Sequence, residues 1–177
     1  KGIPQASKER YALFTLNTIL GAGVSSRLFQ EVREKRGLAY AIYSFLASYS
    51  DTGVWGIYAG VSRKRVREVI ELILRETHHL RETITEGELQ RAKNQLKGNI
   101  ILGLESTSSR MNNIARQEIY HGKYFSPREI MDEIDSITVE HIRDLADTIV
   151  RKDALALTVY GPVQEQDLDV FLQDIAP

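Results

Sequence analysis

Histidine is the first residue type to examine for chemistry, because hydrolytic metal sites are commonly built from it. The sequence has four: His78, His79, His121 and His141. Only His79 begins a spacing close to the inverted zinc motif H-x-x-E-H, which sets two imidazoles and a carboxylate on one helix face. Glu82 fills the acidic position, but Thr83 stands where the second histidine belongs. A catalytic zinc needs about three protein ligands, so we expect no metal site in this chain and interpret residues 79–83 as a solvated helix end.

Nucleophilic and nucleic-acid chemistry find no support in the sequence. It has no cysteine, and no serine lies in a G-x-S-x-G elbow. Gly21 and Gly23 follow a predicted helix and lack the third glycine of a dinucleotide-binding loop. Residues 63–67 form a small basic cluster, but the net charge is −1 and no aromatic residues are interleaved. That cluster therefore indicates a solvated surface and not a nucleic-acid site.

The first third of the chain predicts two helices followed by a β-hairpin. Residues 7–20 are apolar on nearly every side, which is typical of a helix buried between other elements. A second helix is expected over residues 26–35, with Gly37 as its left-handed stop. Residues 38–49 and 54–61 are rich in β-formers, and a D-T-G turn joins them, so they predict antiparallel strands.

Helices dominate the rest of the chain. An apolar stripe of period 3.6 runs through residues 66–80. Capping boxes open two more helices, one at Thr85 with Glu88 and one at Ser126 with Glu129. The remaining predicted elements are helices over residues 109–120 and 139–150, and a last strand over residues 154–160.

This order of elements predicts an α+β fold: a two-layer sandwich with helices on one face of a mostly antiparallel sheet. The 177 residues and 42% apolar content fit a single domain over residues 1–177. The chain lacks an initiator methionine and runs almost directly into a helix, which we interpret as a cut within a longer two-domain protein. No apolar run approaches the roughly 18–20 residues of a membrane span, and the lack of cysteine fits a reducing compartment. We therefore expect a soluble, cytoplasmic protein.

The most specific pattern is in residues 21–40, GAGVSSRLFQEVREKRGLAY. It closely resembles the second-domain signature of the insulinase-type (pitrilysin-like, M16) zinc metallopeptidases. Similar blocks follow at residues 91–97 (RAKNQLK), 119–124 (IYHGKY) and 159–162 (VYGP). The resemblance covers nearly the whole chain, includes processing-peptidase-like members, and implies the M16/LuxS-like fold.

The resemblance implies that this chain is the C-terminal-type half, which holds no metal. In such peptidases two similar domains form a clamshell, and the first binds zinc through H-x-x-E-H and a more distant glutamate. The second contributes an arginine and a tyrosine seven residues apart, which map onto Arg33 and Tyr40. The opening helix over residues 7–20 has no histidine, in agreement with the second half. Zinc is therefore expected on a partner N-terminal domain, in the same or another chain.

Elementary chemistry is compatible with these roles. A guanidinium is a fixed fork of donors suited to peptide carbonyls, and a phenol can donate to the oxyanion of a hydrolytic transition state. Arg33 ends the predicted helix and Tyr40 begins the strand, so both emerge near one corner of the sheet. The spacing alone favours Arg33 as a surface helix charge and Tyr40 as a packed strand residue, and the resemblance is what favours the functional roles. Arg36 is an alternative to Arg33.

Two functions stay open. One is the non-zinc half of a zinc endopeptidase, which helps bind short extended peptides and stabilise the transition state. The other is a non-catalytic scaffold or assembly subunit of the same fold. The chain alone is not assigned as an enzyme, whereas the intact protein is expected to be a zinc metalloendopeptidase. Exposed clamshell surface adds the hypothesis of a homodimer.

Overall fold

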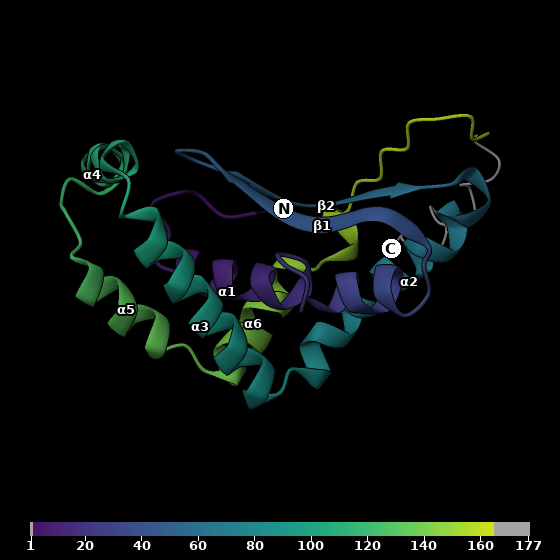
Figure 1. Ribbon diagram of the computed structural model, residues 1–177, viewed down its shortest axis with the longest axis horizontal. Coiled ribbons are helices and arrows are strands. Elements are labelled where there is room, and N and C mark those ends of the chain that lie inside the picture. The colour runs from purple at the N-terminus through teal and green to yellow at the C-terminus, as the bar shows by residue number, and fades with distance from the viewer. Residues whose placement is uncertain (1, 165–177) are drawn as a thin grey trace.

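A β-hairpin lies over a group of helices in the computed structural model, which describes residues 2–164 (Figure 1). The helices are α1 (Arg10–Leu20), α2 (Val66–Thr83), α3 (Glu86–Gly103), α4 (Thr107–His121), α5 (Pro127–Asp135) and α6 (Val139–Ile149). The strands are β1 (Ala39–Ser48) and β2 (Gly53–Val61), and three short helical turns are η1 (Phe29–Glu34), η2 (Arg63–Arg65) and η3 (Lys152–Ala154). Helices α1, α3, α5 and α6 lie on one side of the antiparallel hairpin, so the predicted α+β class is confirmed.

The hairpin has one face toward the helices and one open face, because successive strand side chains point in opposite directions. Ile42 is buried on the helix side, and Leu46, Trp55 and Ile57 pack against the core there. The Trp55 indole Nε1 donates to the Oδ1 of Asn17 in α1 at 2.8 Å. The indole is therefore half-buried without leaving its polar atom unpaired.

Helix α1 is the centre of the core. It packs against α3, α6 and β1, and Leu13, Leu16 and Leu20 are almost completely buried. An apolar surface on nearly every side is what such a position requires. The prediction of a buried helix at this place is confirmed, although the helix begins at Arg10 and the residues before it form turns.

The junction between α1 and β1 is tight at Gly21. The backbone N–H of Ser44 donates to the carbonyl of Gly21 at 3.1 Å. A Cβ at position 21 would lie 2.5 Å from that same nitrogen. Since the neighbour is backbone, it has little freedom to give way, and only glycine fits this contact.

The start and stop signals in the sequence are confirmed in detail. Thr85 with Glu88 and Ser126 with Glu129 both form reciprocal capping boxes. Gly37 has a φ of +59°, the left-handed conformation expected after the second helix.

Two predicted elements differ in the structure. Residues 154–160 were expected to form a strand, and this prediction is wrong for the described chain. In the part described, the sheet has only β1 and β2, and residues 155–160 make no backbone hydrogen bond. A β-rich alternating sequence still needs a strand edge beside it. The predicted single domain over residues 1–177 stays a prediction, because residues 165–177 lie outside the described part.

The second difference concerns the helix expected over residues 26–35. Residues 29–34 of it form a π-helical turn, η1, in which the N–H of Lys35 donates to the carbonyl of Gln30, five residues back, at 3.0 Å. Periodicity does not separate a π turn from an α-helix over so short a span.

Candidate functional site

Arg33 lies in the last turn of η1, and its side chain is exposed. Its backbone carbonyl accepts from the N–H of Gly37 at 3.0 Å, which closes the turn toward β1. The guanidinium carbon lies 5.0 Å from the centroid of the Phe29 ring. Within the described part of the chain the guanidinium makes no ion pair, so its donors stay available to a ligand.

Arg36, the alternative to Arg33, is already occupied. Its Nη1 donates to the carboxylate of Glu31 at 2.5 Å and to the backbone carbonyl of Glu31 at 2.6 Å. Lys35 donates to the other carboxylate oxygen. These hydrogen bonds, that of Arg36 first and that of Lys35 second, lower the pKa of Glu31. Two of the three cations in this segment are therefore bound to one carboxylate, and Arg33 is left apart.

Tyr40 is the extra residue of a β-bulge. Ala39 pairs with Val61 and Ala41 pairs with Gly60, so β1 advances two residues where β2 advances one. Bulges bend the strand locally and redirect a side chain. The Tyr40 side chain is 89% exposed, which excludes the alternative of a packed strand residue.

The backbone brings Arg33 and Tyr40 to the same junction. The N–H of Leu38 donates to the carbonyl of Val32 at 2.9 Å, and Gly37 supplies the left-handed turn between them. Both side chains thus leave the fold where η1 meets β1. No hydrogen bond joins the two side chains within residues 2–164, and their joint action on a peptide stays a prediction.

Arg27 and Gln95, which also belong to the blocks of the sequence signature, stabilise the segment that precedes this junction. Arg27 donates through Nε and Nη2 to the two carboxylate oxygens of Glu88, at 2.8 and 2.9 Å. Burial alone would raise the pKa of Glu88, but the hydrogen bonds from Arg27 and Thr85 outweigh it and lower the pKa. Gln95 of α3 donates to the carbonyl of Ala22 at 2.8 Å and holds the glycine turn.

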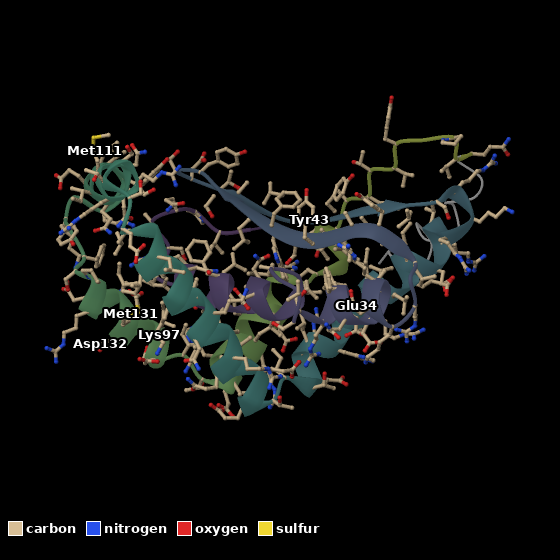
Figure 2. The ribbon with its side chains drawn as sticks, viewed as in Figure 1. Glu34, Tyr43, Lys97, Met111, Met131 and Asp132 are labelled. Atoms are coloured by element: carbon tan, nitrogen blue, oxygen red, sulfur yellow. The ribbon has the colours of Figure 1, made fainter. Side chains whose placement is uncertain are left out.

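The open face of the hairpin is aromatic, a feature that was not predicted from the sequence. Tyr43 and Tyr58 are paired across the strands and stack at a centroid distance of 5.1 Å. Phe45 pairs with Gly56, and its ring covers the space that a side chain there would fill. In Figure 2, Tyr43 points away from the helices. The alternation of aromatic residues at positions 43 and 45 is the signal from which this face could have been found.

A zinc ion does not fit the described residues of this chain. Residues 2–164 contain no group of three histidine, aspartate or glutamate side chains placed to share a metal. His79 and Glu82 are exposed on the last turns of α2, in agreement with the solvated helix end. His141 is paired with Glu9 at 2.5 Å, and His121 lies edge-on to Phe125.

A cavity of about 410 Å³ lies elsewhere, between α1, α3, α4 and α5. Its lining includes Arg10, which donates to Glu133 at 3.1 Å, and His121. Burial is the main cause that lowers the pKa of His121, and the charge of Arg10 adds to it. Neither Arg33 nor Tyr40 lines this cavity, so the candidate site is an exposed surface and not a closed pocket.

The hairpin over helices and the junction of η1 with β1 define a class of protein: the chain belongs to the family of the peptidase M16 inactive domain, whose model matches residues 1–96. It is 40% identical over 167 residues to an uncharacterized zinc protease of Streptomyces coelicolor, covering 93% of this chain and 36% of that protein. It is also 40% identical over 159 residues to the uncharacterized zinc protease YmxG of Bacillus subtilis, covering 89% of this chain and 39% of that protein. The chain thus spans little more than a third of these relatives.

Solved structures agree with this family. The peptidase M16 inactive domain from Pseudomonas fluorescens matches with a TM-score of 0.75 and 26% identity, over 83% of this chain and 35% of that one. A chain of Complex III2 from Candida albicans matches with a TM-score of 0.75 and 27% identity, over 83% and 37%. The predicted family, its inactive-domain half and its fold are therefore confirmed. Among the described helices, none has the length and apolar character needed to cross a membrane.

Proposed function

We propose that this domain completes the peptide site of a zinc endopeptidase by offering Arg33 and Tyr40 to a substrate held against a separate, zinc-bearing domain. The observation that carries the proposal is the exposure of both side chains at one junction, where neither has a hydrogen-bond partner within residues 2–164. Two relatives are named zinc proteases, which supports a metal on a domain outside this chain.

Each side chain has a distinct part in this proposal. The Arg33 guanidinium donates to a backbone carbonyl of the peptide and orients it. The Tyr40 hydroxyl donates to the oxyanion that forms when the scissile carbonyl is attacked. Because Tyr40 is on a bulge and not in the regular ladder, its hydroxyl can extend beyond the sheet.

The aromatic face beside this junction supports the same proposal. Tyr43, Phe45 and Tyr58 offer broad apolar rings with polar tips, which suit peptide side chains of varied sequence. Backbone hydrogen bonding to an extended peptide has little dependence on sequence, so we expect a loose preference for residue type. Whether the partner domain is covalently joined or separate, the requirement on Arg33 and Tyr40 is the same.

The substitution Tyr40→Phe tests the proposal in the complete protein with its zinc-bearing domain. We expect kcat on a quenched extended peptide to fall about 10²-fold, as for loss of one oxyanion donor, with zinc content unchanged. Tyr124→Phe removes a hydroxyl from a half-exposed tyrosine between α4 and α5 and serves as the control. Unchanged activity in Tyr40→Phe would exclude Tyr40 from the mechanism.

The second candidate function is a scaffold, and the similarity to a chain of Complex III2 from Candida albicans favours it. A scaffold has no use for an unpaired arginine beside a bulged tyrosine. Absence of zinc and of peptidase activity from the complete protein would support the scaffold and exclude the peptidase half.

A further inference from the structure

We propose that Phe29 is a positioning residue for Arg33, and that its ring holds the guanidinium in place at the junction of η1 and β1. The proposal rests on the peptide-binding role of Arg33 given above. The guanidinium carbon lies 5.0 Å from the ring centroid. This is within the roughly 6 Å at which a cation is attracted to an aromatic face.

Phe29 is half-buried and is not one of the side chains that form the hydrophobic core. Leu28 and Val32 are completely buried and attach this segment to the core. Among the described residues, Phe29 belongs neither to the core nor to the half-buried side chains that pack against it. Phe29 precedes Arg33 by four residues, and side chains at this spacing lie next to each other on one face of a helix.

The π turn keeps Phe29 and Arg33 together. The N–H of Lys35 reaches back five residues to Gln30, one residue further than in an α turn and two further than in a 3₁₀ turn, so η1 is wider than either. Single π turns occur frequently at functional sites. Because Leu28 and Val32 fix one side of this turn in the core, the adjoining side with Phe29 and Arg33 is fixed as well.

An aromatic ring holds a guanidinium in a way that a carboxylate does not. A carboxylate neutralises the charge and occupies two of the five N–H donors. A ring face attracts the cation while the donors in the guanidinium plane stay free. Glu31 binds Lys35 and Arg36, which leaves Arg33 charged and with donors available for a substrate carbonyl.

The experiment compares Phe29→Leu, Phe29→Tyr, Arg33→Ala and the double variant Phe29→Leu/Arg33→Ala in the complete zinc-loaded peptidase, with kcat and KM measured on a quenched extended peptide. Leucine keeps an apolar side chain but has no π face. We expect Phe29→Leu to raise KM about two- to fivefold with kcat unchanged, the size of an exposed cation–π contact. Phe29→Tyr keeps the ring and the parent KM, and the double variant has the KM of Arg33→Ala.

Each result has a separate meaning. An unchanged KM in Phe29→Leu, with Arg33→Ala impaired, overturns the positioning role and leaves the peptidase proposal standing. An equal effect of Phe29→Leu in both backgrounds shows that Phe29 acts through packing, which also overturns the role. Full activity of Arg33→Ala overturns both the role of Arg33 and that of Phe29. Melting temperatures are measured for every variant, and Phe29→Met replaces Phe29→Leu if the latter does not fold.

Discussion

Arg27 shows that a signature residue can be structural and still matter for the site. It donates to the carboxylate of Glu88, and its Nη1 donates to the hydroxyl of Thr83 at 2.8 Å. The side chains of Arg27 and Glu88 are only 13% and 22% exposed. This pair joins the segment before η1 to the capping box of α3, so it fixes the element that presents Arg33.

We predict that Glu88→Gln lowers the free energy of unfolding by about 1–2 kcal/mol at pH 7, since a partly buried charged pair is lost. Glu118→Gln, which removes an exposed carboxylate on α4, is the control and should change it little. Urea unfolding of both variants beside the parent chain gives the comparison.

The same pair predicts a pH dependence. The pKa of Glu88 in the fold is lower than its ordinary value of 4.5, so the folded state binds this proton less readily than the unfolded chain. The stabilisation is therefore present above that ordinary value and is lost as pH falls through the lowered one. We expect the stability difference between parent and Glu88→Gln to shrink toward zero in acid. A difference that stays constant down to the acid end would show that Glu88 acts through shape alone.

At the scale of elements, local signals were the most reliable guide. The capping boxes, Gly37 and the hairpin turn depend on neighbours within four residues, and all were predicted correctly. The strand expected at residues 154–160 depends on a distant edge to pair with, and composition cannot supply one. The β-bulge at Tyr40 was missed for the same reason, since it is defined by the register of two strands.

In the candidate site, too, the features that depend on tertiary packing could not be predicted from the sequence. Arg33 and Tyr40 came from the resemblance, because their spacing has no unique physical meaning. The ring of Phe29 four residues before Arg33 is visible in the sequence, but its use depends on which side of the turn faces the core. The occupation of Arg36 by Glu31 likewise needed side-chain geometry.

We predict that Gly21→Ala lowers the free energy of unfolding by about 1–3 kcal/mol, the usual range for overpacking, because the new Cβ meets the backbone of Ser44. The matched control is Gly98→Ala in α3, where a Cβ meets nothing within 4 Å. Alanine there should stabilise the chain by about 0.5–1 kcal/mol, as expected within a helix. Urea midpoints with unchanged m-values measure both, and equal effects of the two substitutions would contradict the close contact at Gly21.

At the scale of the whole molecule, α4 is the least integrated helix. Gln117 is its one buried residue in the described structure. Asn113, Arg116 and Gln117 line the cavity toward the body, whereas Met111 and Ile119 are 63% and 76% exposed. Figure 2 shows Met111 on the side of α4 away from the body. The polar side of this helix thus faces inward and its apolar side outward, the reverse of a surface helix on a finished core.

The exposed apolar side chains of Met111 and Ile119 form a stripe on α4 that favours association of two copies of the chain. The homodimer hypothesis can therefore be tested on the 177-residue chain. We expect light scattering after size exclusion to show a molar mass that rises with concentration. The double substitution Met111→Lys/Ile119→Lys should weaken this association at least about tenfold, or about 1.4 kcal/mol, because two exposed apolar side chains become charged. Tyr43→Ser/Tyr58→Ser changes the open face of the hairpin instead and is the matched control. If the hairpin variant abolishes association and the α4 variant does not, the aromatic face is the self-contact, and α4 needs another explanation for its exposed stripe.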